Sequence, residues 1–188
     1  MKNAIILHGR PSKAEYYNPD RPSMSNSHWL PWLQSQLLKH DIAAVTPEVP
    51  FSFQPVWKEW VKEVERFEIG PETILVGHSC GGGFWVRYLS EHPKLKVGKV
   101  VLVAPWIDVE RSDKDFFDFK IDPDFVKRTQ SLIVFHSDND KEEMQTSLKK
   151  LKAEIPNLDV RIFHDYGHFT IGTMKTPEFP ELLEEIFK

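Results

Sequence analysis

Cysteine is almost absent from this sequence of 188 residues, since Cys80 is the only one. A single thiol cannot form an intramolecular disulfide, and it cannot supply a four-thiolate or binuclear metal site. An excess of one charge is missing too, because 24 Lys and Arg stand against 28 Asp and Glu, a net charge of −4. Such a surface gives no electrostatic reason to bind nucleic acid or an anionic membrane, so we expect neither partner.

Long hydrophobic runs are also missing. The longest covers residues 100–107 and is interrupted by Pro105, whereas a membrane span needs about 20 apolar residues. Near the start, only residues 4–7 are consecutively apolar, and a signal peptide needs about 7 to 15. We therefore expect a soluble, cytoplasmic protein.

Repeats and low-complexity segments are absent, and the composition is ordinary for a globular chain, with 40% hydrophobic and 12% aromatic residues. At roughly 100 to 200 residues per domain, this length predicts one domain over residues 1–188.

Short apolar runs alternate with helical patterns along the chain. Continuously apolar runs of this kind are typical of strands in a parallel sheet that is covered on both faces. The pattern predicts an α/β fold, a three-layer α/β/α sandwich with about six mostly parallel strands. The predicted strands are 3–7, 42–45, 73–76, 97–104, 131–135 and 158–163.

One acidic region, residues 107–124, interrupts this alternation. It contains six aspartates together with Phe116 and Phe117. It is either a solvated loop with a local apolar plug or a small lid whose phenylalanines cover a pocket.

A nucleophile elbow is predicted at Gly77-His78-Ser79-Cys80-Gly81, which matches the pattern G-x-S-x-G. The motif lies in a glycine-rich turn, 77–83, between an apolar strand and a helix that we expect to start at Phe84. The turn forces the serine into a strained conformation, and the glycines leave room for it. Ser79 is therefore the candidate nucleophile.

A serine hydroxyl needs a base, and the base needs an orienting carboxylate, in the chain order serine, acid, histidine. His168 stands in a glycine-containing loop after the last predicted strand, where this base belongs. His164 is a weaker alternative at the end of that strand. The acid falls in the turn after strand 131–135, where Asp138 and Asp140 fit equally well by position.

The oxyanion of an acyl-transfer intermediate needs two N–H donors. We expect one from the backbone of Cys80, directly after the nucleophile. The second should come from the loop after strand 3–7, from the backbone of Arg10 or of Gly9.

With these residues assembled, the chain resembles the α/β-hydrolases, and more narrowly the small serine hydrolases of the YdeN and retinoblastoma-binding-protein type. The resemblance covers nearly the whole chain and rests on four segments. They are His8-Gly9, the stretch 27–33, Gly77-His78-Ser79 and the closing stretch 165–169. It implies a compact α/β-hydrolase fold.

The resemblance also implies which aspartate is the acid. The family's turn reads Ser-Asp-Asn-Asp and its last Asp belongs to the triad, which here is Asp140. The chain departs from the family directly afterwards, where residues 141–144 replace a proline-containing stretch.

The sequence thus predicts a serine hydrolase that cleaves a small carboxylic ester, an amide or a thioester, with no metal or organic cofactor. Its rivals are a lipase-like enzyme and a non-catalytic interaction module that keeps the fold. Candidate pocket walls are aromatic: Tyr16, Trp29, Trp106, Phe116 and Phe117.

Overall fold

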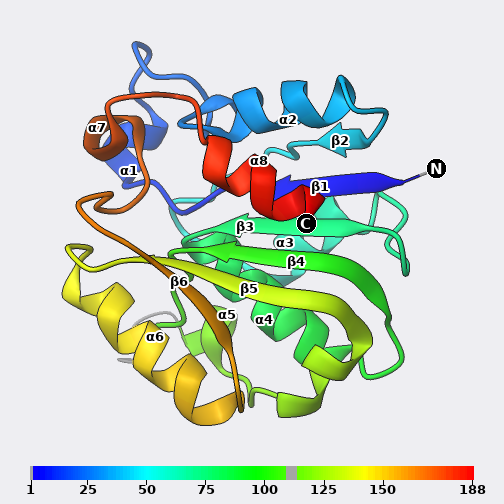
Figure 1. Cartoon of the computed structure of the whole chain (residues 1–188). Coiled ribbons are helices and arrows are strands. Elements are labelled where there is room, and N and C mark those ends of the chain that lie inside the picture. Colours follow the sequence, from blue (N-terminus) through cyan, green and yellow to red (C-terminus); the bar gives the residue numbers. More distant parts are fainter. Residues whose placement is uncertain (1, 109–113) are drawn as a thin grey trace.

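Six strands form the middle layer of the fold within residues 2–108 and 114–188, which the computed structural model describes (Figure 1). The strands are β1 (Asn3–Leu7), β2 (Ala43–Val45), β3 (Ile74–His78), β4 (Val97–Val103), β5 (Thr129–Ser137) and β6 (Asp159–Phe163). The helices are α1 (Lys13–Tyr16), α2 (Leu30–Leu38), α3 (Trp57–Val64), α4 (Cys80–Glu91), α5 (Lys114–Phe117), α6 (Glu142–Glu154), α7 (Ile171–Met174) and α8 (Pro180–Phe187). Short 3-10 turns cover Met24–Asn26 and Pro123–Arg128.

The strands lie in the order β2-β1-β3-β4-β5-β6, and every neighbouring pair is parallel. This confirms the predicted α/β fold. The chain passes from β1 outward to β2 and then returns to place β3 on the other side of β1. Loops that leave β1 and β3 therefore diverge, and such a reversal leaves a crevice at the carboxyl ends of these strands, where α/β proteins bind ligands.

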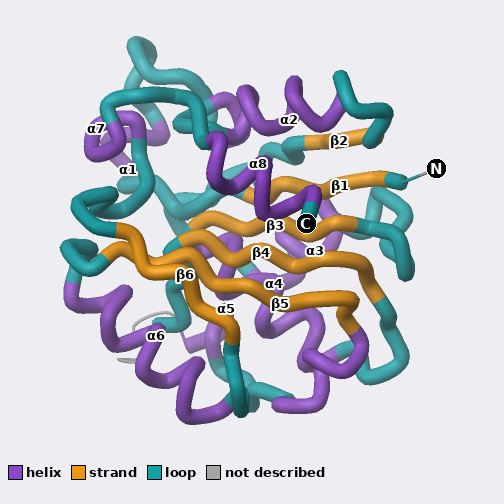
Figure 2. Tube along the Cα trace, viewed as in Figure 1, coloured by secondary structure: helices purple, strands orange, loops and turns teal. Residues whose placement is uncertain are grey.

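Helices lie on both sides of the sheet (Figure 2). Alternate residues of the strands face these two sides, and an apolar core lies on each. Ile5 and Leu7 belong to the core that contains residues of α3, α4 and α6. Ala4 and Ile6 belong to the core that contains residues of α2 and α8. Because both faces are covered, the inner strands β1, β3 and β4 are largely apolar and buried, as the sequence pattern indicated. The edge strand β6 is instead mostly exposed.

The predicted start of the helix after Ser79 is wrong. Helix α4 begins at Cys80 rather than at Phe84, so that Gly81, Gly82 and Gly83 are helical and not part of a turn. Glycine weakens a helix, but here it allows close packing, because a Cβ on Gly83 would lie 1.9 Å from the Trp106 carbonyl oxygen.

The predicted lid, 107–124, includes residues 109–113, which lie outside the described residues, so the lid stays a prediction. Of its described part, Phe116 and Phe117 are buried. The Phe116 ring packs against Trp60 at 5.1 Å between centroids. No helix in the described parts of the chain is long and apolar enough to span a bilayer.

Candidate active site

The residue after β3, Ser79, has a strained backbone. Its φ is 53° and its ψ is −117°, outside the regions that side-chain-bearing residues ordinarily adopt. Such strain costs about 1–3 kcal/mol and persists only where the surroundings fix it. Here the Ser79 N–H donates to the Val103 carbonyl at 2.9 Å, and the Ser79 carbonyl accepts from the Trp106 N–H at 3.0 Å. The end of β4 therefore holds the sharp turn in place.

Glycines on both sides of Ser79 make this turn possible. A Cβ on Gly77 would lie 2.6 Å from the Gly81 carbonyl oxygen, and a Cβ on Gly81 would lie 2.5 Å from the His8 carbonyl oxygen. Helix α4 can therefore start directly beneath the serine, with Cys80 as its first residue. The first N–H groups of a helix have no intrahelical partner and favour an anion. The Cys80 side chain is buried.

An acidic side chain from the turn after β5 meets His168, which follows β6. The His168 Nδ1 lies 2.9 Å from Asp140 Oδ2 and 3.1 Å from Oδ1. The Asp140 side chain is 0% exposed and that of His168 is 19% exposed. A carboxylate only accepts hydrogen bonds, so His168 Nδ1 carries the proton and donates it. In the neutral ring this leaves Nε2 as the nitrogen that accepts a proton, as in a general base.

The other candidate acid, Asp138, pairs elsewhere. Its Oδ2 lies 2.5 Å from His164 Nδ1, and its Oδ1 accepts from the Asp165 N–H at 3.2 Å. The hydrogen bond from His164 lowers the pKa of Asp138. The Asp138 side chain is 45% exposed and that of His164 80% exposed. The structure thus brings Asp140, and not Asp138, to His168.

The side chain of the residue before the nucleophile, His78, links the loop of His168 to the turn that carries Ser79. Its Nε2–H donates to the His168 carbonyl at 2.8 Å, and the two rings lie 5.0 Å apart between centroids. Within the described residues, the hydrogen bonds of the His168 ring go to Asp140, and none joins it to the Ser79 hydroxyl. Contacts of this kind are often long in structures without substrate and tighten when it binds.

The loop after β1 brings a further peptide group beside Ser79. A Cβ on Gly9 would lie 3.1 Å from the Ser79 Cβ. The buried His8 ring accepts the Val49 N–H at Nε2 (3.0 Å), so its proton lies on Nδ1 and is donated to the Gly9 carbonyl (2.7 Å). In a trans peptide the C=O and N–H point in opposite directions. The Arg10 N–H therefore points away from His8, which favours Arg10 over Gly9 as the second donor.

Most of the aromatic residues predicted as pocket walls lie in the core. Trp29, Phe116 and Phe117 are buried, and the Trp29 Nε1–H donates to the Phe169 carbonyl at 3.0 Å. Tyr16 and Trp106 retain exposed surface.

Sequence reasoning missed the side chains that hold the site's loops together. His78 donates a hydrogen bond to the His168 carbonyl. Asn139, in the turn after β5, accepts one from the Gly167 N–H in the loop after β6, at 2.8 Å. Hydrophobic periodicity does not mark such residues, because their partners are backbone groups distant in the sequence. The one available signal was the position of Asn139 between two candidate acids.

The sequence matches a known protein family over most of its length. The family model described as serine hydrolase matches residues 21–182. The chain belongs to the serine hydrolase family. This confirms the resemblance seen in the sequence and supports a hydrolytic function for this serine hydrolase family member.

One curated relative and several solved structures are similar to this chain in sequence or in fold. The Bacillus subtilis (strain 168) protein YdeN, which bears the name of a hydrolase, is 32% identical over 107 residues. The match covers 55% of this chain and spans half the length of YdeN (50%). The crystal structure of the B. subtilis ydeN gene product has a TM-score of 0.82 at 23% identity, covering 100% of this chain and 97% of that one. Est1E from Butyrivibrio proteoclasticus has a TM-score of 0.64 at 13% identity, covering 99% and 88%. At these identities the structural likeness shows the fold alone.

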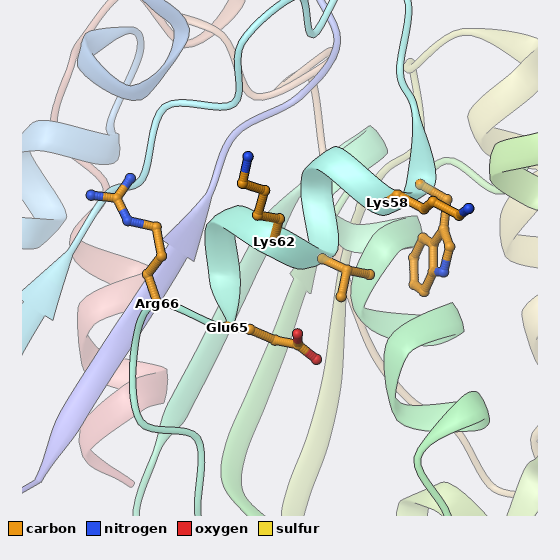
Figure 3. Close-up of a pocket in the computed structure, with 6 residues that line it drawn as sticks. Lys58, Lys62, Glu65 and Arg66 are labelled. Atoms are coloured by element: carbon orange, nitrogen blue, oxygen red, sulfur yellow. The ribbon is translucent and has the colours of Figure 1, made fainter.

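Two hollows in this serine hydrolase family member lie away from the candidate triad. The one on α3 has a volume of about 320 Å³ (Figure 3). Its lining consists of Trp57, Lys58, Val61, Lys62, Glu65 and Arg66. The second, of about 500 Å³, includes Lys2, Gly98 and Asp159 and lies at the amino ends of the strands. Neither is lined by Ser79, Asp140 or His168.

Burial lowers the pKa of three histidines near the site. For His28, burial and the neighbouring His168 lower the pKa to about 4. Burial and His168 also hold the pKa of His78 well below its usual value. For His8, burial lowers the pKa against the opposing effect of Glu48. All three rings are therefore neutral in the folded protein at pH 7.

Acidification is expected to destabilise the fold through these rings. In the unfolded chain each takes up a proton near pH 6.5, but in the fold only at lower pH, so their stabilisation is complete above about pH 6.5 and falls as the pH drops toward 4. For His28, whose pKa in the fold is about 4, the cost at pH 5.5 is about 1.4 kcal/mol relative to pH 7.5, and His78 and His8 shift the stability in the same direction. Urea unfolding at the two pH values measures this. His28→Asn, which suits the φ of 59° at this position, should remove about 1.4 kcal/mol of the difference. Equal stabilities at the two pH values would contradict the assignment.

Proposed function

We propose that this protein is a serine hydrolase that cleaves small carboxylic esters through Ser79, His168 and Asp140. One observation carries the proposal: a buried Asp140 is hydrogen-bonded to His168, whose backbone is held against the residue that precedes the strained Ser79. This arrangement matches the roles of nucleophile, base and orienting carboxylate. Amides and thioesters would follow the same course.

In the proposed acylation, the Ser79 hydroxyl attacks the carbonyl carbon of the ester and its proton passes to His168 Nε2. The resulting oxyanion accepts hydrogen bonds from the backbone N–H groups of Cys80 and Arg10. When the tetrahedral intermediate collapses, the alcohol leaves with the proton from His168. The acyl group is then bonded to Ser79.

In the proposed deacylation, a water molecule gives a proton to His168 Nε2 and attacks the acyl carbon. The proton returns to the Ser79 oxygen as the carboxylic acid leaves. Asp140 accepts from Nδ1–H throughout, and thereby stabilises the imidazolium that forms in each half-reaction.

The proposed preference for small acyl groups is testable with esters of increasing chain length. A buried CH₂ contributes about 0.8 kcal/mol, roughly a fourfold gain in kcat/KM, but only where an apolar wall covers it. The proposed preference therefore predicts hydrolysis of p-nitrophenyl acetate and butyrate, with kcat/KM flat or falling from butyrate to palmitate. A steep rise would favour the lipase-like alternative, and no turnover of any ester would favour the interaction module.

A further inference from the structure

Two side chains of the turn after β5, Ser137 and Asn139, bind backbone N–H groups of the loop that carries His168. Ser137 Oγ accepts from the Tyr166 N–H at 3.1 Å and donates to Asn139 Oδ1 at 2.8 Å. The same Asn139 Oδ1 accepts from the Gly167 N–H at 2.8 Å. Two consecutive N–H groups, directly before His168, are thus bound to a turn that ends at Asp140.

A third hydrogen bond joins the same turn and loop through two side chains. Asn139 Nδ2–H donates to Asp165 Oδ1 at 3.3 Å. The amide of Asn139 therefore uses both ends between the same two segments. Its oxygen binds the backbone and its nitrogen binds a side chain, which also fixes which end of the amide is which.

The turn itself is also held from α6. Gln145, on α6, donates through Nε2 to the carbonyls of Ser137 and Asp138 at 3.1 and 3.2 Å. Its Oε1 lies 2.7 Å from His136 Nε2, which donates to it. The turn is thus braced from α6, and the distinct contribution of Asn139 is the connection to the loop of His168.

This connection acts on the contact between Asp140 and His168 from both sides. Asn139 directly precedes Asp140, and its partner Gly167 directly precedes His168. On the other side of His168, its carbonyl is held by His78 Nε2–H at 2.8 Å. The backbone of His168 is therefore fixed both before and after the residue, which leaves little freedom for its ring to leave Asp140.

We propose that Asn139 is a positioning residue. Its hydrogen bonds link the turn that carries Asp140 to the loop that carries His168, and so set the geometry of the Asp140–His168 pair. The inference rests on the proposed function in assigning that pair to catalysis. Asn139 itself does not touch the reacting atoms. Its effect is to hold two groups in register, and a misplacement of about 1 Å can cost about 10²-fold in rate.

The test replaces Asn139 by leucine, which has a similar size but no acceptor, and measures both kcat and the NMR signal of His168 Nδ1–H. We expect kcat toward p-nitrophenyl acetate to fall about 10²-fold with KM within about twofold. We also expect the far-downfield Nδ1–H resonance of His168 to broaden or vanish. Asn139→Ala removes the same acceptor without adding apolar surface and is made in parallel, so that the test does not depend on one variant folding.

A swap of the two partners provides the rescue. In the double variant Asn139→Asp with Asp165→Asn, residue 139 still accepts from Gly167, and the bond between 139 and 165 re-forms with reversed polarity. Asn suits residue 165, where φ is 61°. Recovery of kcat to within about threefold of wild type is expected. The matched control, Asp165→Asn alone, keeps the Asn139 oxygen bonds and should retain wild-type kcat.

Wild-type kcat and an intact Nδ1–H resonance in folded Asn139→Leu and Asn139→Ala would overturn the proposal, and so would a swap that restores neither. The resonance separates this from failure of the proposed function. A wild-type protein that hydrolyses no ester, yet loses the resonance on substitution of Asn139, would refute the proposed esterase function and would still support the positioning role of Asn139.

Discussion

Asp140→Asn is expected to lower kcat by about 10⁴, the size of the loss when the comparable aspartate of a serine protease becomes asparagine. The physical reason is the tautomer of His168. The Asp140 oxygens lie 2.9 and 3.1 Å from His168 Nδ1, so they hold the proton on that nitrogen. An asparagine there can offer an N–H to Nδ1, which shifts the proton of the ring to Nε2. That nitrogen then cannot accept the proton of Ser79.

The same chemical change two residues earlier is the matched control. Asp138→Asn removes a charge from the same turn, but its partner is His164, which is 80% exposed. We expect kcat to stay within about threefold of wild type. Both values come from initial rates with p-nitrophenyl acetate, after circular dichroism has shown that each variant folds. An active Asp140→Asn beside an inactive Asp138→Asn would reverse the assignment of the acid.

Ser79→Ala is expected to have the largest effect, a loss of about 10⁶ in kcat, as found on removal of the nucleophile in subtilisin. Alanine bears the same backbone strain at a φ of 53° as serine does, so that the fold should keep its stability. Ser90→Ala, on the same helix, removes a hydroxyl that binds the Val86 carbonyl at 2.7 Å and should leave kcat near wild type. Ester hydrolysis by Ser79→Ala at the wild-type rate would show that Ser79 is not the nucleophile.

Much of the fold was predictable because each buried strand is a short apolar run between polar segments. The expected strand at 97–104 is β4 (Val97–Val103), and the one at 3–7 is β1 (Asn3–Leu7). The start of α4 was not predictable from local preference, since three glycines disfavour a helix. Only the approach of Trp106 to Gly83 shows why glycine is needed there.

Some residues of the candidate site could be located from the sequence and others could not. Ser79 and His168 could be located in the sequence because the motif and the chain order refer to strand ends, which the hydrophobic pattern marks. Asp138 and Asp140 could not be separated by position, because both lie in one turn and only its three-dimensional path directs Asp140 to His168. Trp29 was one of five candidates for the pocket wall, yet it is buried, since an aromatic residue at the start of a helix serves a core as readily as a pocket.

Labelling with a fluorophosphonate probe tests most directly whether Ser79 is an activated nucleophile. Intact mass analysis followed by peptide mapping identifies the modified residue. We predict a single adduct on Ser79, absent from Ser79→Ala and present in Ser90→Ala. A folded wild-type protein that takes no adduct, or takes it on another residue, would show that Ser79 is not the activated nucleophile.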